Sequence, residues 1–456
     1  MEKLFKLKAH GTDTRTEVVA GFTTFLSMVY ILAVNPNILS AAGMDRAGIF
    51  TATAVSAAFA TLCMAFFANY PVALASGMGL NAYFAFSVCI PMAKAGIQDP
   101  WKIALAAVLV EGIVFILLSF TNFREKLVND IPENLKYGIT AGIGLFITII
   151  GLKGAGIVIA SPETLVDMGA VNSPQFILAL VGFILIAVLH HFNVKGAILI
   201  GIIGTWALGM IAQATGWYVV NPELEAFSLY PSLKGSSFIP KIPELFAFDF
   251  TWISKNIITF ATIVFSFLFV DIFDTVGTLI GVASKGNLLD ENGNLPNAKG
   301  ALLADAVGTV AGACLGTSTV TSYVESSAGV AAGGRTGLTA LTSAVLFIIA
   351  LFFSPIFLAI PGFATTPALV WVGLLMMSTV KNMTFEGDMA DVVGGFLALI
   401  MMPFTYSIAN GIMFGMLAWV ILKILSGNIN KIPVVMWVSA LLFALRFYTL
   451  VKGLSF

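Results

Sequence analysis

Long apolar runs recur along the whole chain, and most of them are long enough to cross a bilayer as a helix, which takes about 20 residues. They fall near residues 18–34, 48–68, 72–92, 103–120, 136–151, 175–190, 196–212, 254–284, 298–314, 318–333, 337–360, 366–380, 389–404 and 408–425. A polar segment with several prolines, residues 213–252, separates the first seven runs from the next seven. The pattern therefore predicts an all-α polytopic membrane protein with fourteen transmembrane segments. Hydropathy leaves open whether a last apolar stretch, 432–450, spans the membrane or lies at its interface.

The two halves share an unusual third segment. PVALASGMGLNAYFAFSV (71–88) and GTSTVTSYVESSAGVAAGG (316–334) are short and contain Gly, Ser or Thr where an ordinary span would be apolar. An odd number of spans per half gives the second half the opposite orientation, as in an inverted repeat. Interrupted segments at matching positions of two such halves are typical of a transporter binding site.

Composition narrows the class of protein. Of the 456 residues, 58% are hydrophobic and only 10% are charged, against about 25% charged in soluble domains. The net charge of −1 gives no electrostatic reason to expect nucleic acid as a partner. The sequence contains no HExxH, GxSxG or GxxxxGK[ST] motif, so no zinc protease, hydrolase or ATP-driven pump is indicated. We expect neither enzymatic activity nor a cofactor, and we interpret Cys63, Cys89 and Cys314 as packing residues.

The N-terminus is basic, with Lys3, Lys6, Lys8 and Arg15 ahead of the first apolar run. That run lacks the short core and small-residue cleavage site of a signal peptide, so it is interpreted as the first span. Positive charges favour the cytoplasmic side. The sequence thus predicts a multi-pass protein of the cell (inner or plasma) membrane with its N-terminus in the cytoplasm.

Two aspartates, Asp271 and Asp274, lie deep inside the apolar run 257–283, which has no other charged residue. An ionised carboxylate at bilayer depth costs about 2.5–3.5 kcal/mol even on gentle scales, so such acids usually face a cavity. Their spacing of three places both on one helix face, together with Thr275 and Thr278. A structural network with neighbouring hydroxyls is the alternative. Two acids on one face favour proton exchange or the binding of ligand N–H groups.

Further candidates lie in the interrupted segments. Glu325 is an intramembrane acid, and a role facing a cavity is favoured over a pair with Arg335, ten residues away. Near Gly79, a glycine-rich strip can let the backbone approach a ligand, and a new half-helix would offer unpaired N–H groups. Asn81 supplies a donor and an acceptor. A packing interface with Asn81 as a helix cap is an equally good interpretation.

Four other acids carry weaker signals. Glu111 is a weak candidate for a pair across helices, and Asp305 is ambiguous. Asp388 and Asp391 are interpreted as charges at the start of a helix near the interface.

Three strips, SGMGLNAYFAF (76–86), LFVDIFDTVGTLIGVA (268–283) and GTSTVTSYVESSAGVAAGGRTGLTAL (316–341), closely resemble the AzgA-like purine permeases of bacteria and fungi. These belong to a wider nucleobase transporter group that includes the uracil and xanthine permeases. The start of the chain, GTDTRTEVVAGFTTFLSMVYILAVNP (11–36), resembles them too, so the likeness covers nearly the whole chain.

The resemblance implies two inverted seven-span repeats that form a core and a gate domain. The core would comprise residues 1–125 and 253–362, and the gate residues 126–252 and 363–456. Short strands at the start of the third and tenth spans would pair near the midplane. Members of the family look like H⁺-coupled importers of adenine, guanine and hypoxanthine that move by an elevator-like shift and are often dimeric in the wider group.

The resemblance also implies site residues. Asp271 and Asp274 match the acidic pair of the family's eighth span, where a Glu replaces the second Asp in the uracil and xanthine branches. The residues implied to bind substrate are Asp274, Glu325, Asn81, Gly79, Phe84 and Tyr323. The carboxylates would accept purine N–H groups, backbone N–H groups near Gly79 and Tyr323 would meet ring acceptors, and Phe84 would stack on the base. Either Asp271 or Glu325 would carry the proton, since interacting carboxylates titrate as a set.

Several alternatives stay open. An anion transporter or channel of the same fold would be expected to place a cation, not three acids, at the midplane. A uracil or xanthine permease is a second alternative, and a membrane-embedded enzyme would need a motif such as GxGD that is absent. The sequence leaves open which purine is preferred and whether Na⁺ replaces H⁺.

Overall fold

A computed structural model describes residues 2–119, 130–221, 227–231, 238–290 and 295–451. Within those residues, eleven helices are long and apolar enough to cross a membrane, and two further apolar helices are shorter. The chain is therefore a helical, polytopic membrane protein, as predicted. The predicted domain boundary between residues 125 and 126 lies outside the described ranges.

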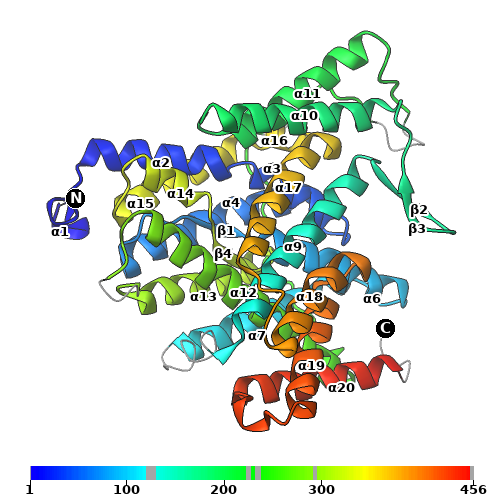
Figure 1. Cartoon of the computed structure of the whole chain (residues 1–456). Helices are drawn as coiled ribbons and strands as arrows, with labels where there is room; N and C mark the ends of the chain where they lie inside the picture. Colours follow the sequence, from blue (N-terminus) through cyan, green and yellow to red (C-terminus); the bar gives the residue numbers. More distant parts are fainter. Residues whose placement is uncertain (1, 120–129, 222–226, 232–237, 291–294, 452–456) are drawn as a thin grey trace.

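One group of helices packs around a pair of short strands, and we name it the strand-pair bundle (Figure 1). Its main helices are α2 (Thr14–Met28), α3 (Ile31–Ser40), α4 (Arg46–Cys63), α7 (Pro100–Ser119), α12 (Ile257–Lys285), α13 (Ala298–Leu315) and α15 (Gly337–Ala350). Segments from both halves of the sequence are mixed in it, because α13 packs on α4 and α7, and α15 packs on α2 and α4.

A second group, the α9 bundle, is built on α9 (Glu133–Gly154). It also contains α17 (Gly362–Met377), α18 (Met389–Phe404) and α19 (Ile408–Leu425), with α10 (Pro174–His191) and α11 (Ala197–Ala214) packed on α17. Small residues let the backbones of these helices approach closely. A Cβ added to Gly138 of α9 would lie only 2.2 Å from the carbonyl oxygen of Gly395 on α18.

The two interrupted segments contain the short strands that were expected. β1 (Leu74–Ser76) and β4 (Val320–Ser322) pair antiparallel, with Ala75 opposite Thr321. Short helices follow, α5 (Met78–Ala82) after β1 and α14 (Ser326–Ala331) after β4. A second antiparallel pair, β2 (Val158–Ser161) with β3 (Leu165–Met168), was not predicted, and it projects from the helices in Figure 1.

The last apolar stretch forms α20 (Val434–Val451), which packs against both α19 and α12. Phe443 of α20 is fully buried and meets Phe265 of α12 edge-on, with ring centroids 5.4 Å apart. Trp437 and Leu441 are exposed on another face of the same helix. The stretch 432–450 is thus a helix that lies against both bundles.

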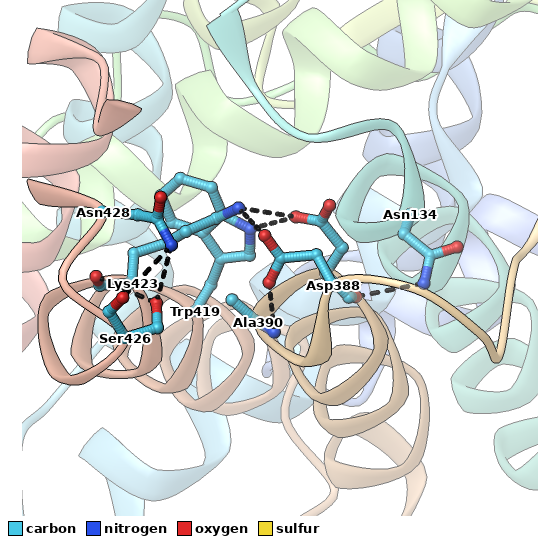
Figure 2. A network of polar contacts seen from close by, with 8 residues as sticks. Asn134, Asp388, Ala390, Trp419, Lys423, Ser426 and Asn428 are labelled. Carbon is cyan, nitrogen blue, oxygen red and sulfur yellow. Dashed lines mark hydrogen bonds and ion pairs between the residues drawn. The ribbon is translucent and has the colours of Figure 1, made fainter. Parts of the chain in front are cut away.

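A polar network ties α18 to α19 (Figure 2). Lys423, near the end of α19, is only 6% exposed and forms an ion pair with Asp388, which caps α18 by accepting from the N–H of Ala390 at 2.9 Å. Trp419 Nε1 donates to Asp391 Oδ1 at 2.6 Å. The prediction that Asp388 and Asp391 are charges at a helix start is confirmed. The hydrogen bond from Lys423 holds the pKa of Asp388 below its ordinary value.

Asn134 extends this network to α9 (Figure 2). Its Nδ2 donates to the carbonyl oxygens of Thr384 and Asp391, at 2.9 and 3.0 Å, and its Oδ1 accepts from the N–H of Thr384 at 2.8 Å. One end of the α9 bundle is therefore held by side-chain bonds that join three of its helices.

Candidate functional site

The strand pair is extended on both sides by further hydrogen bonds. The N–H of Gly77 donates to Thr319 O and the N–H of Tyr323 donates to Ala73 O, each at 3.0 Å. The hydroxyl of Tyr323 donates to Ser76 O at 2.6 Å. Strand pairing therefore uses the N–H of Tyr323 itself, so a backbone N–H offered to a ligand in this region would have to come from a neighbouring residue.

Glu325 lies directly before α14 and is 9% exposed. It accepts a hydrogen bond from the hydroxyl of fully buried Tyr30, with Oε1 2.5 Å from the phenol oxygen. The side chain of Arg335 instead donates to the carbonyl oxygens of Val330 and Gly334, each at 2.7 Å. Glu325 is therefore paired with Tyr30 of the first apolar segment and not with Arg335. This agrees with the prediction that its side chain faces the interior of the protein.

Asp274, on α12, is half-buried and lies within electrostatic range of Glu325. Tyr323 lies within range of both carboxylates. The structure thus brings together three of the predicted site residues, from α12 and from the segment that follows β4. Two acids that are close in space repel each other when both are ionised, and a proton or a ligand N–H group between them relieves that repulsion.

Asn81 is fully buried in α5 and bonds back to β1. Its Oδ1 accepts from the hydroxyl of Ser76 at 2.7 Å, and its Nδ2 lies 3.4 Å from Ser76 O. The Ser76 hydroxyl also lies 3.2 Å from that of Thr317. Gly77, not Asn81, occupies the N-cap position of α5, so the interpretation of Asn81 as a helix cap is wrong. Asn81 instead fixes the half-helix to the strand.

Gly79 lies where α5 meets the α9 bundle. A Cβ added at this position would lie 2.7 Å from Cγ2 of Ile143 on α9. The two bundles approach closely here and leave little room for a side chain, which fits the packing interface that was one of the two interpretations of this strip.

Phe84 follows in the π-helix η3 (Tyr83–Cys89) and is fully buried. Its ring centroid lies 6.4 Å from that of Phe267 on α12, and the ring of Tyr83 meets Phe267 edge-on at 4.8 Å. An aromatic cluster therefore lies between η3 and α12.

Asp271 has different neighbours from Asp274, although both are on one helix. It is fully buried, and its Oδ1 lies 3.5 Å from the hydroxyl of Thr275. That hydroxyl also lies 2.8 Å from Asp305 Oδ1 and 2.7 Å from the hydroxyl of Thr321. The spacing of three predicted both aspartates on one helix face; in the structure Asp271 is linked through Thr275 to Asp305, whereas Asp274 lies near Glu325.

Two acids that carried weak signals also lie beside β4. Glu111 accepts from the hydroxyl of Thr319 at 3.1 Å, which confirms the prediction that it pairs across helices. Asp305, which was ambiguous, accepts from Thr275 and lies 3.4 Å from the hydroxyl of Ser322. In the part of the chain that the structure describes, no group of three or more His, Cys, Asp or Glu side chains is arranged to hold a metal ion.

Sequence reasoning missed Tyr30 and Ser76. Tyr30 lies in an ordinary apolar run, and its partner is 295 residues away in the sequence. Ser76 was noted only as part of a glycine-rich strip. A tyrosine or serine in an apolar segment is too common to mark a site, so neither could be found by spacing.

Comparison with known proteins agrees with this geometry. The model of a family described as "Permease family" (Xan_ur_permease) matches residues 15–414. The guanine/hypoxanthine permease PbuO of Bacillus subtilis is 46% identical over 452 residues, covering 98% of this chain and 100% of that protein. The adenine permease AdeP of Escherichia coli is 41% identical over 450 residues, covering 98% of this chain and 95% of that protein.

A solved structure shares the fold. The transmembrane domain of the cyanobacterial bicarbonate transporter BicA superposes with a TM-score of 0.64 at 14% identity, covering 87% of this chain and 97% of that domain. Since the identity is low, this likeness concerns the fold alone. The family match and the two relatives together show that the chain belongs to the Permease family and is one of its AzgA-like members.

Proposed function

We propose that this protein is a secondary active transporter that imports purine nucleobases by proton symport. The observation that carries the proposal is the meeting of two acids, Asp274 and Glu325, beside the strand pair of a permease. A purine base presents several N–H groups, and paired carboxylates in an apolar setting are strong acceptors for them. The names of PbuO and AdeP support purines as the substrate class.

Five of the six predicted substrate residues have a role in this proposal. Asp274 and Glu325 accept the N–H groups of the base, and the bond from Tyr30 keeps one oxygen of Glu325 in place. Asn81 holds α5 against β1, and Gly79 lets the two bundles approach closely. We propose that Phe84, whose ring now lies in the aromatic cluster beside Phe267, stacks on the base.

Proton coupling is assigned to Asp271. It is fully buried and is linked through Thr275 to Asp305, whereas Asp274 is in range of Glu325. This arrangement supports a division of labour in which one aspartate binds the base and the other exchanges the proton. Glu325 is the second candidate, because it too is a buried acid inside an interrupted segment.

We also propose a transport architecture. The strand-pair bundle would be the core (residues 1–125 and 253–362), and the α9 bundle would be the gate (residues 126–252 and 363–456). The eleven long apolar helices, the two interrupted segments and α18 would supply fourteen spans as two inverted repeats, with a cytoplasmic N-terminus. Transport would follow an elevator-like shift of the core against the gate, and the protein would be a homodimer in the cell membrane.

The fold shared with a bicarbonate transporter suggests a competing hypothesis, in which this protein carries an anion. The acids beside the strand pair argue against an anion substrate, because ionised Asp274 and Glu325 would repel it. A uracil or xanthine permease is the rival within the family.

Uptake of radiolabelled hypoxanthine into proteoliposomes tests the proposal. Unlabelled adenine, guanine, hypoxanthine, xanthine and uracil are added as competitors, and an imposed pH gradient is compared with a sodium gradient and with a protonophore. We expect competition by purines and uptake that follows the pH gradient. Bicarbonate or sulfate flux without any purine uptake would show that the anion rival is correct. Wild-type uptake and proton dependence in both Asp271→Asn and Glu325→Gln would refute the coupling assignment.

A further inference from the structure

Three buried tyrosines lie around the strand pair and the half-helix, and their hydroxyls differ in what they contact. Tyr30 donates to Glu325, and Tyr323 donates to Ser76 O. The hydroxyl of Tyr83 is buried and has no hydrogen-bond partner among the residues that the structure describes, and the residue is only 1% exposed. A buried hydroxyl without a partner is unfavourable, so its presence calls for a reason.

The position of Tyr83 suggests that its hydroxyl binds a ligand. It follows Gly79 by four residues on the same helical stretch, so the two share a face. At Gly79 this face meets Ile143 of α9, which places it at the junction of the two bundles. The helix that carries Asp274, α12, also packs against both α5 and α9.

The ring of Tyr83 also connects to the helix that carries the aspartates. It meets the ring of Phe267 edge-on, with centroids 4.8 Å apart and an interplanar angle of 71°. Phe267 precedes Asp271 by four residues and Asp274 by seven on α12, so the three share one face. Tyr83 therefore packs on the acid-bearing face of α12.

The hydrogen-bond donors and acceptors of the proposed site indicate what the Tyr83 hydroxyl would bind. Carboxylates such as Asp274 and Glu325 only accept hydrogen bonds when ionised. A purine with a ring carbonyl needs a donor as well. The donors of Tyr30, Tyr323 and Asn81 are directed to protein atoms. Tyr83 has a donor that no described residue uses.

We infer that Tyr83 is a specificity-determining residue whose hydroxyl donates to the ring carbonyl of an oxopurine such as hypoxanthine or guanine. The inference rests on the proposed purine transport. Adenine carries an amino group in place of that carbonyl, so at this position it offers no acceptor for the proton of the Tyr83 hydroxyl and relies chiefly on the carboxylates.

Tyr83→Phe tests the inference, because it keeps the ring against Phe267 and removes only the hydroxyl. Binding of hypoxanthine, guanine and adenine to purified wild-type and variant protein is measured, together with the melting temperature without substrate. We expect the Kd for hypoxanthine and guanine to rise about fivefold to tenfold, the usual effect of one neutral hydrogen bond. The Kd for adenine should stay within about twofold, and the melting temperature without substrate should not fall. Tyr137→Phe, on α9, is the matched control and should change none of these values.

The outcomes separate the two proposals. If the wild-type protein binds oxopurines and Tyr83→Phe binds them equally well, the Tyr83 assignment is wrong and the proposed function stands. An equal loss for all three bases would also overturn it, since the hydroxyl would then not distinguish a carbonyl from an amine. Absence of purine binding by the wild-type protein would overturn both.

Discussion

The hydroxyl of Tyr30 and the carboxylate of Glu325 are joined by a 2.5 Å hydrogen bond across 295 residues of sequence. Tyr30 lies in the turn between α2 and α3, and Glu325 lies directly before α14. The bond therefore ties the first apolar segment to the second interrupted segment. It also orients the acid that we propose binds the base.

Removal of this donor should weaken substrate binding. A hydrogen bond to a charged group is worth about 1.5–3 kcal/mol, so Tyr30→Phe should raise the Kd for hypoxanthine by about tenfold to a hundredfold. The measurement is equilibrium binding, with the melting temperature recorded in parallel. Tyr218→Phe serves as control, because that hydroxyl bonds to Phe227 O in the loop. An unchanged Kd in Tyr30→Phe would mean that Glu325 needs no orienting partner.

The two aspartates of α12 should separate binding from coupling. Asp274→Asn should lose purine binding by about a hundredfold, because an amide replaces an acceptor that is charged. Asp271→Asn should still bind purine but should no longer accumulate it against a gradient, since its neutral side chain cannot exchange a proton. Binding and pH-driven uptake are compared for each variant. The same defect in both variants would contradict the division of labour.

Gly79 should not tolerate a side chain. A Cβ there would lie 2.7 Å from Cγ2 of Ile143, and the branched side chain of isoleucine turns only with difficulty. Gly79→Val should abolish uptake, and Gly79→Ala should reduce it severalfold. Ile143→Ala should restore part of the uptake of Gly79→Ala by making room.

Gly277→Ala on α12 is the matched control for this clash. An added Cβ at Gly277 meets no atom within 4 Å, so uptake should be unchanged. If Gly79→Ala transports normally without the Ile143 change, the close approach of the two bundles is not required for transport.

Lys423 should stabilise the α9 bundle in a manner that depends on pH. It lowers the pKa of Asp388, so the stabilisation is present above the ordinary aspartate pKa of about 3.9 and is lost as the pH falls through the lower, folded value. Lys423→Met should lower the melting temperature at pH 7 by about 2–4 °C. This difference in melting temperature should shrink as the pH falls, because protonation of Asp388 removes the ion pair from the wild-type protein as well.

Melting curves between pH 3 and pH 7 measure this difference, with Lys255→Met as the control at an exposed lysine. The control should follow the wild-type curve throughout. If the melting temperature of Lys423→Met stays below that of the wild type by the same amount down to pH 3, the stabilisation does not come from the ion pair with Asp388.

The sequence by itself determined the membrane character and the identity of the critical acids. Long apolar runs predict helices because a helix satisfies its backbone within one segment, which a bilayer demands. Asp271, Asp274 and Glu325 stood out because a charge inside such a run is costly. The interrupted segments around Gly79 and Tyr323 stood out because they lack the apolar continuity of a span, and the family resemblance implied the paired strands found there.

Only the tertiary structure decided which of these groups meet. Helical spacing placed Asp271 and Asp274 on one face, yet packing set Asp274 near Glu325 and linked Asp271 to Asp305. The partner of Glu325 and the use of the Tyr323 N–H within the strand pair were likewise decided by packing. A local sequence pattern indicates whether one segment is apolar or polar and which secondary structure it forms. Contacts between segments hundreds of residues apart depend on how whole helices pack, and no spacing along the chain encodes that.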